Sequence, residues 1–325
     1  MPMDALVARA PTRLDFGGGW TDVPPYSDER GGCVCNIAIE LHAIATVRSR
    51  PATDISQDTD FTGDTALAAA ATRRAAMPDV RVEVEAEYPL GAGLGGSSAA
   101  GVAVLGALAS WRGEPIDRGR LAEESRQLEV EDLGIAGGRQ DHYAAAMGGA
   151  LGLWFGGDVN VKQIALSDRA VDALHRRCIV VYTGQSRISA NTITAVMNAY
   201  RARNARVLDA LDRLRDLAGQ MVNALETGDI ESLGAMVGEH WIHQRALDPA
   251  IPTPLIDTIL AEAAAAGALG GKALGASGGG CVLAIAADGR ENDVRRAMAA
   301  RATPLPVSVA RHGFEVVRRS APAAL

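Results

Sequence analysis

The sequence has no excess of positive charge. Lysine and arginine together number 32, aspartate and glutamate number 39, and the formal net charge at pH 7 is −7. A protein whose main partner is a nucleic-acid backbone or an anionic membrane needs a basic surface, so this balance argues against both. We therefore expect a small-molecule partner, with no nucleic acid and no membrane among the partners of the chain.

Cysteine is also scarce. The four cysteines, at positions 33, 35, 178 and 281, show neither C-x-x-C spacing nor the density of a disulfide framework. The first residues lack the basic start and apolar stretch of a signal peptide, and charged residues or glycine interrupt the alanine-rich runs before they reach membrane length. These absences predict a cytoplasmic protein with reduced thiols.

Two familiar nucleotide-binding patterns are missing as well. The P-loop pattern G-x-x-x-x-G-K-[ST] is absent, because Gly271-Lys272 is followed by Ala273. Gly91-x-Gly93-x-x-Gly96 matches the dinucleotide fingerprint, which also requires a second strand ending in an acidic residue about twenty positions later. The sequence after position 116 is charged and helical instead, so the NAD-binding interpretation fails.

Glycine, by contrast, is abundant, with 36 copies. Much of the excess lies in three clusters, Phe16–Asp22, Pro89–Ala100 and Gly275–Gly280. A glycine run that opens into a helix can aim several amide groups at phosphate oxygens, and the second cluster has that layout. A tight turn is the alternative for any single cluster. Ser97 and Ser98 add hydroxyls at the helix start, where one of them can reach a magnesium ion.

Strands and helices are mixed along the chain without a sustained β-α-β alternation, which predicts an α+β protein. Strict alternation in Arg81–Glu87 indicates a half-exposed strand, and the small apolar residues of Ser97–Trp111 indicate a buried helix. Further strands are expected at 6–10, 33–39, 43–48, 150–155, 159–166, 178–182, 281–286, 307–310 and 315–317, and helices at 65–76, 117–132, 140–147, between 189 and 245, and at 253–266. We place a domain boundary near 170, giving domains 1–170 and 171–325.

The three glycine clusters, in this order, resemble the motifs of the GHMP kinase superfamily, and the resemblance spans almost the whole chain. The motifs are Arg9–Asp22, Pro89–Ala100 and Lys272–Gly280. Gly18–Tyr26, Gly137–Tyr143 and Tyr182–Arg187 further resemble the branch of the fucokinases and D-glycero-D-manno-heptose 7-phosphate kinases, which phosphorylate the anomeric hydroxyl. One departure is Ser277, which stands where another glycine is usual, and a positive φ there would strain the backbone.

The resemblance implies an N-terminal domain like that of ribosomal protein S5, a ferredoxin-like C-terminal domain, and ATP and sugar bound between them. Asp141 corresponds to the catalytic aspartate and Arg13 to the basic residue beside it. Ser98 and Glu129 fall on the Mg²⁺ ligands, with Glu131 as the alternative to Glu129. The other implied nucleotide-binding residues are Gly91, Gly93, Leu94, Gly95, Gly96, Ser97, Gly278 and Gly279, and the implied sugar-binding residues are Gly19, Trp20, Thr21 and Asp22.

These assignments predict an ATP- and Mg²⁺-dependent kinase of an anomeric sugar hydroxyl, with D-glycero-D-manno-heptose 7-phosphate preferred as substrate. Asp141 would accept the hydroxyl proton. A sugar that already carries a phosphate needs a local basic cluster in this acidic chain, for which Arg139 and Arg187 are the candidates. A 1-kinase of a free sugar such as fucose, a non-catalytic sugar sensor and an ATP-dependent decarboxylase are the alternatives. A homodimer is one option for the assembly.

One pair of histidines stands outside these motifs. His240 and His243 have the i, i+3 spacing of a helix face, which suits either a metal site or ordinary packing. No third ligand is evident in the sequence, so packing on a helix face is favoured.

Overall fold

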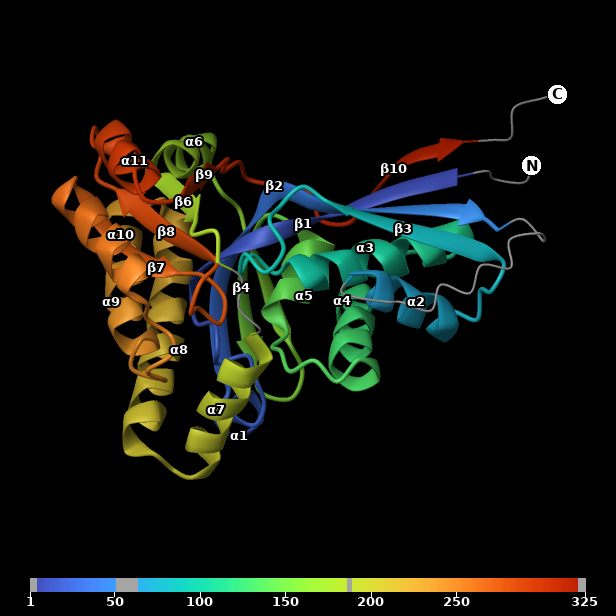
Figure 1. Ribbon diagram of the computed structural model, residues 1–325, viewed down its shortest axis with the longest axis horizontal. Coiled ribbons are helices and arrows are strands. Elements are labelled where there is room, and N and C mark those ends of the chain that lie inside the picture. Colours follow the sequence, from blue (N-terminus) through green and yellow to red (C-terminus); the bar gives the residue numbers. More distant parts are fainter. Residues whose placement is uncertain (1–4, 51–63, 186–188, 321–325) are drawn as a thin grey trace.

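The computed structural model describes residues 5–50, 64–185 and 189–320. It contains two antiparallel sheets with helices packed on them (Figure 1), which confirms the expected α+β class. The first sheet has the order β10-β1-β2-β4-β5, with β3 also paired to β2. Its strands are β1 (Ala5–Gly17), β2 (Gly32–Ser49), β3 (Val80–Ala86), β4 (Ala150–Phe155), β5 (Asn160–Ile164) and β10 (Glu315–Ser320).

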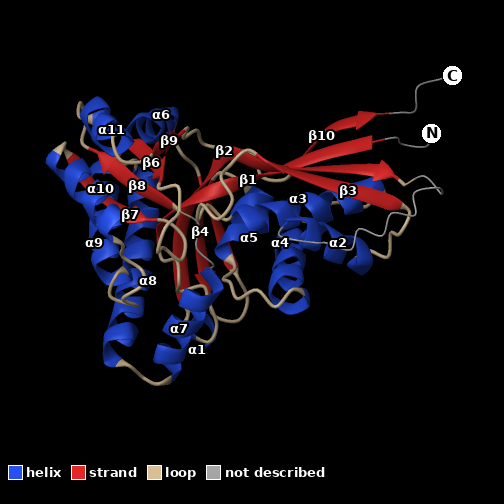
Figure 2. Ribbon diagram, viewed as in Figure 1, coloured by secondary structure: helices blue, strands red, loops and turns tan. Residues whose placement is uncertain are grey.

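The second sheet has the order β7-β8-β6-β9. Its strands are β6 (Cys178–Tyr182), β7 (Ala268–Ala273), β8 (Cys281–Ala286) and β9 (Thr303–Leu305). Strand β8 is buried at every residue, because it lies in the middle of the sheet under helices. The helices beside this sheet are α6 (Asp168–Arg177), α9 (Ile230–Gln244), α10 (Pro254–Ala265) and α11 (Glu291–Ala299) (Figure 2).

Four helices lie together beneath β1, β2 and β3 in the view of Figure 1. They are α2 (Asp64–Arg74), α3 (Gly96–Trp111), α4 (Arg118–Gln127) and α5 (Gln140–Met147). Helix α3 packs directly on β1 and β2, and its small side chains permit that close approach. Gly106 likewise lets α3 approach Phe314, the residue before β10, because a Cβ there would overlap the Phe314 ring. The predicted buried helix is therefore confirmed.

The longest described helix, α8 (Ala205–Thr227), packs between the two sheets. It packs across β1, β2 and β4 of the first sheet and also against α9 beside the second sheet. Glycines make room for it, since a Cβ at Gly17 would overlap Met221 and one at Gly152 would lie 2.9 Å from Val222. Helices α1 (Tyr26–Arg30) and α7 (Ser189–Arg201) lie beside it. None of the described helices is long and apolar enough to cross a membrane.

Several predicted elements change in the structure. The strands expected at 33–39 and 43–48 are one strand, β2, in which an irregularity opposite Pro11 and Thr12 separates Ile39 from His42. The strand expected at 307–310 is wrong, because only Val309 forms an isolated bridge, to Ile39. Strand β7 was not predicted, since its glycines and alanines carry little β propensity.

The chain returns to its first strand at its far end. β10 pairs antiparallel with β1, from Ala5 opposite Ser320 to Arg9 opposite Glu315. Arg9 also forms an ion pair with Glu315 at 3.0 Å. We expected a domain boundary near residue 170. Strand β10 follows that boundary in the sequence but belongs to the first sheet.

Candidate active site

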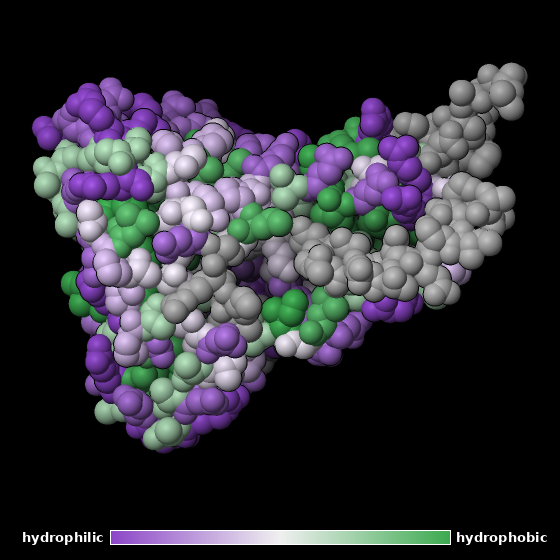
Figure 3. All heavy atoms as spheres, viewed as in Figure 1, coloured by the Kyte–Doolittle hydropathy of each residue, from purple (hydrophilic) through white to green (hydrophobic). Residues whose placement is uncertain are grey.

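A cleft of about 670 Å³ brings the three glycine clusters together. Its lining includes Gly19 from the first cluster, Gly93 from the second and Gly275 from the third, with Glu129 and Asp141 from the helical region between them. Figure 3 shows the surface hollowed near the middle of this face. Residues more than 250 positions apart thus share one site, as the order of the motifs predicted.

The second cluster forms a loop that opens into α3. Gly91, Gly93 and Gly95 have φ values of 69°, 76° and 74°, a region that favours glycine. Gly95 is the N-cap of α3, and no side chain caps the helix there. The amide groups of the first turn are therefore available to an anion, and the helix dipole favours negative charge at this end.

This loop is held firmly between the two sheets. The Cys281 amide of β8 donates to Ala92 O at 2.7 Å, and the Arg13 amide of β1 donates to Leu94 O at 3.1 Å. A Cβ at Gly93 would lie 2.6 Å from Leu274 O. The glycine loop and the third cluster therefore touch backbone to backbone, which a larger residue would prevent.

Arg13 and Asp141 form a bidentate ion pair in the cleft. Arg13 Nε donates to Asp141 Oδ1 at 2.8 Å, and Nη2 donates to Oδ2 at 2.7 Å. Such a bidentate, charge-assisted pair fixes the carboxylate in orientation as well as position. Arg13 Nη1 also donates to Gly93 O at 2.7 Å. One guanidinium thus ties the carboxylate to the glycine loop.

Asp22 supports the helix that carries Asp141. Its Oδ2 accepts the amide groups of Arg139 and Gln140, at 2.8 and 3.0 Å, at the start of α5. Burial, opposed by these hydrogen bonds and assisted by the charge of Asp141, raises the pKa of Asp22 to about 6. A Cβ at Gly138 would overlap the Asp22 carboxylate. Asp22 therefore lines the cleft and also stabilises the start of α5.

Ser98 and Glu129 meet at the start of α3. Ser98 Oγ donates to Glu129 Oε2 at 2.8 Å, and His142 Nε2 lies 3.2 Å from the same oxygen. Glu129 belongs to a π-helical turn, η1 (Leu128–Asp132), which directly continues α4 and directs this carboxylate inward. Burial opposes ionisation of Glu129. Hydrogen bonds from His142, Ser97 and Ser98 outweigh this effect and lower the pKa of Glu129. An ionised carboxylate beside a hydroxyl supplies hard oxygen ligands, so these two residues fit a Mg²⁺ ion.

The remaining predicted site residues differ in whether they reach the cleft. Gly19 and Trp20 line the cleft, whereas the Thr21 hydroxyl is buried and bonded to Gly18 O and Cys33 O at 2.7 and 3.0 Å. The Arg139 side chain points toward Gly157 O, 3.5 Å from Nη1. The third cluster contributes Gly275 and Ala276 to the lining, rather than Gly278 and Gly279. Arg187 lies outside the described residues.

Two features of the site were not predicted. Lys272 Nζ forms an ion pair of 2.8 Å with Asp15, and both side chains are almost completely buried. Burial lowers the pKa of Lys272, although the neighbouring Asp15 opposes that change. Apolar residues also line the cleft beside the glycine loop, and two of them, Leu90 and Ile135, are unusually exposed for large hydrophobic side chains. Pattern alone marks neither feature, because each depends on residues brought together from afar.

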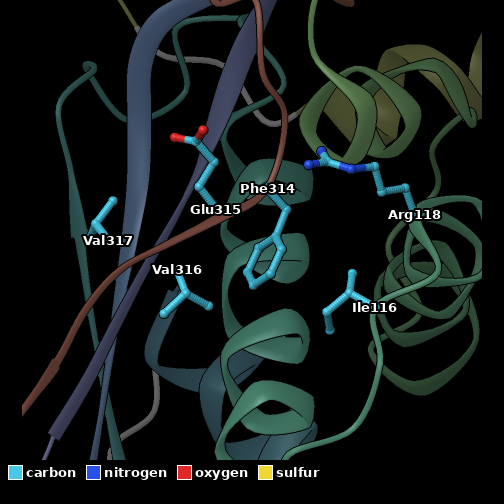
Figure 4. Close-up of a pocket in the computed structure, with 6 residues that line it drawn as sticks. All are labelled: Ile116, Arg118, Phe314, Glu315, Val316 and Val317. Carbon is cyan, nitrogen blue, oxygen red and sulfur yellow. The ribbon is translucent and has the colours of Figure 1, made fainter.

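A second hollow, of about 620 Å³, lies at β10 (Figure 4). Its two charged residues are already engaged: Glu315 pairs with Arg9, and Arg118 donates to Ala146 O. The other four lining residues are Ile116, Phe314, Val316 and Val317. Both charged residues of this hollow are therefore engaged, and the rest of its lining is apolar.

The two histidines of the pair face different surroundings. His240 is fully buried and its Nε2 accepts the Gly18 amide at 2.9 Å, whereas His243 is partly exposed and lies 3.9 Å from Glu239. Within the described ranges, no cluster of three histidine, cysteine or acidic side chains could hold a metal ion. His240 therefore packs inside the protein, in line with the packing interpretation.

Comparison with known proteins places this geometry in a family. The family model for the GHMP kinases N terminal domain matches residues 64–149, and that for the GHMP kinases C terminal region matches residues 221–303. The D-glycero-alpha-D-manno-heptose 7-phosphate kinase of Campylobacter jejuni is 28% identical over 86% of this chain and 88% of its own length. The L-fucokinase/L-fucose-1-P guanylyltransferase of Bacteroides fragilis is 27% identical over 86% of this chain, which spans only 34% of that larger enzyme.

Solved structures agree on the fold. The crystal structure of a D-glycero-D-manno-heptose 1-phosphate kinase from Bacteroides thetaiotaomicron superposes with a TM-score of 0.77 and 24% identity, covering 97% of this chain and all of the other. Both family models match in the expected order, and together they span more than half of the chain. The chain belongs to the GHMP kinase superfamily of ATP-dependent phosphotransferases.

Proposed function

We propose that this protein transfers the γ-phosphate of ATP to the anomeric hydroxyl of a sugar, and that its substrate is D-glycero-D-manno-heptose 7-phosphate. The observation that carries the proposal is the place of Asp141. Arg13 holds both of its oxygens, and a Cβ at Gly95 of the phosphate loop would lie 3.0 Å from its carboxyl carbon. The carboxylate therefore lies beside the loop that would hold the transferred phosphate.

In the proposed reaction, the sugar oxygen bonds to the γ-phosphorus while the bond from that phosphorus to the leaving ADP oxygen breaks. Asp141 accepts the proton of the attacking hydroxyl. The amide groups of 91–98 bind the phosphates, and Arg13 keeps the carboxylate aimed at the acceptor. When bound by Ser98 and Glu129, Mg²⁺ would neutralise charge on the β- and γ-phosphates. The apolar wall that includes Leu90 and Ile135 suits the nucleotide base.

The choice of heptose 7-phosphate is supported by the similarity over almost the full length to the Campylobacter jejuni enzyme. In the proposed site, Asp22 accepts hydrogen bonds from sugar hydroxyls at the cleft wall formed with Gly19 and Trp20. Arg139 and Arg187 receive the remote phosphate. An acidic chain needs such a local cluster to bind a dianion.

A free sugar such as fucose is the second candidate, and one observation favours it. Among the described residues that line the cleft, Arg13 is the one lysine or arginine, and Asp141 already engages it. Arg139 would have to turn from Gly157 toward the cleft to meet a phosphate. The similarity to the Bacteroides fragilis enzyme is consistent with this candidate.

A coupled ADP-release assay over free and phosphorylated hexoses and heptoses tests the proposal. We expect heptose 7-phosphate to give the highest kcat/KM. Arg139→Ala and Arg187→Ala should each reduce kcat/KM for the phosphorylated sugar more than for a free sugar. Arg296→Ala is the control, since Arg296 is largely exposed on α11. A free sugar that wins the screen with a salt-independent kcat/KM replaces the heptose phosphate, and absence of ADP release with every acceptor favours the sugar sensor.

A further inference from the structure

Helix α9 places two buried polar side chains one turn apart, and each reaches a different loop of the cleft. His240 and Gln244 are 0% and 1% exposed. Neither is part of the cleft lining, so neither is positioned to touch a substrate. Buried polar groups are costly unless they are bonded, so their partners indicate why they are there.

His240 holds the acceptor side of the cleft. Its Nε2 accepts the amide of Gly18 at 2.9 Å. Gly18 has a φ of 88°, and its carbonyl accepts the Thr21 hydroxyl at 2.7 Å. The imidazole therefore fixes the start of the turn that carries Gly19, Trp20 and Asp22.

Gln244 holds the nucleotide side. Its Nε2 donates to Ser277 Oγ at 2.8 Å, and it also lies 3.2 Å from Ala273 O and 3.4 Å from Gly275 O. Ser277 has a φ of 64°, so the strained conformation expected for a serine at this position is present. The hydrogen bond from Gln244 helps to hold it.

The two side chains are also complementary to each other. A neutral imidazole that accepts at Nε2 carries its proton on Nδ1 and can donate there. Burial lowers the pKa of His240 well below its usual range, and a hydrogen bond with Gln244 opposes this change. His240 Nδ1 and Gln244 Oε1 are both buried, and neither has a hydrogen-bond partner in the structure.

We infer, on the basis of the proposed function, that His240 and Gln244 are positioning residues which join the acceptor turn at Gly18 to the nucleotide loop at Ser277. The connection runs from the Gly18 amide to His240, across one helical turn to Gln244, and on to the Ser277 hydroxyl. Because α9 is a rigid element, a change at either end alters the geometry at the other. Correct placement of one substrate loop thereby depends on the other.

Calorimetric titration of ATP without any acceptor tests this connection separately from the sugar assignment. His240→Leu removes the acceptor for Gly18, and Gln244→Met removes the amide at similar volume. We expect each to weaken ATP binding by roughly 5- to 10-fold, within the usual range of coupling between sites. The double variant should bind ATP with a Kd no more than about twice that of the weaker-binding single variant, because one substitution already breaks the connection. His243→Leu, on the same helix but outside the cluster, should bind ATP as the wild type does.

Two further measurements keep the test decisive. Ser277→Gly removes the hydroxyl while relieving the positive φ, so it should fold well and still weaken ATP binding. His240→Gln keeps an acceptor for Gly18 and should recover part of the affinity lost in His240→Leu. Wild-type ATP affinity in His240→Leu, or fully multiplicative losses in the double variant, would overturn the inference. A wild type that binds ATP but phosphorylates no sugar would overturn the proposed function and leave this connection standing.

Discussion

Arg13 and Asp141, which lie 128 positions apart in the sequence, form two hydrogen bonds of 2.8 and 2.7 Å. The arginine side chain is 4% exposed and that of the aspartate 25%. The pair is therefore buried on the arginine side and open on the side of the aspartate. A substrate hydroxyl can reach the carboxylate without disturbing the guanidinium.

Asp141→Asn should leave the protein folded and able to bind ATP, because asparagine keeps the size and one acceptor oxygen for Arg13. Turnover should fall roughly 10²-fold or more, since the proton acceptor is lost. Steady-state kinetics with ADP detection, combined with ATP titration, measures both effects. Asp168→Asn, at an exposed surface position, is the control. Turnover within a few-fold of wild type would contradict the role of Asp141.

Ser98→Ala and Glu129→Gln should each raise the Mg²⁺ concentration needed for half-maximal rate. Each substitution removes an oxygen ligand or its charge from a site suited to a hard cation. Rates measured over a Mg²⁺ titration at saturating ATP test this. Glu131→Gln is the matched control, because Glu131 is more than half exposed and pairs with Arg126. A larger Mg²⁺ defect in Glu131→Gln than in Glu129→Gln would reassign the ligand.

The raised pKa of Asp22, about 6, predicts an acidic limb in the pH profile. If the ionised carboxylate accepts hydrogen bonds from the sugar, kcat/KM for the sugar should fall as the pH drops through about 6. Asp22→Asn should lower kcat/KM and remove that limb. An unchanged limb in the variant would assign it to another group.

The same shift affects stability in the opposite direction. The folded state holds the Asp22 proton more tightly than the unfolded state, whose pKa is near 3.8. This contribution to the free energy of unfolding is therefore fully present below about pH 4 and lost as the pH rises through 6. Urea unfolding of Asp22→Asn and wild type, compared at pH 5 and pH 7, should show the variant gaining relative stability at the higher pH.

A pair of adjacent glycines tests the support that Asp22 gives to α5. A Cβ at Gly138 would overlap the Asp22 carboxylate, whereas a Cβ at Gly137 meets nothing within 4 Å. Gly138→Ala should therefore raise the KM for the sugar and lower kcat, roughly 10-fold in kcat/KM, since small displacements of catalytic groups are costly. Gly137→Ala should differ from wild type by less than twofold. Equal effects in the two variants would argue against this role for the Asp22 contact.

The sequence predicted the parts of the site that local pattern encodes. Glycine runs beside strands and helices predicted a loop with left-handed glycines, which the structure contains at Gly91, Gly93 and Gly95; phosphate binding by this loop stays a prediction. The motifs also paired Arg13 with Asp141 correctly, because their spacing resembles a known family. The expected positive φ at Ser277 was found as well.

Contacts without a local signature could not be predicted in this way. Lys272 and Asp15 lie 257 positions apart, and the sequence around each residue gives no sign that they form an ion pair. The contact of Asp22 with the start of α5 depends on how that helix packs against the first motif. The buried position of the Thr21 hydroxyl depends on β2, because Cys33 O accepts its hydrogen bond. Strand β2 was divided in two because Glu40, at its irregularity, interrupts the apolar pattern with an exposed charge.

The pairing of β1 with β10 has a consequence for synthesis of the protein. Arg9 meets Glu315 across 306 positions, so the ribosome makes one partner long before the other. At about 5–20 residues per second, the corresponding edge of β1 waits roughly 15 to 60 s for its strand. An unpaired edge is a template for pairing with other chains. The nascent chain thus carries an aggregation-prone edge through most of its translation, and cellular factors that shield such edges should raise the yield of folded protein.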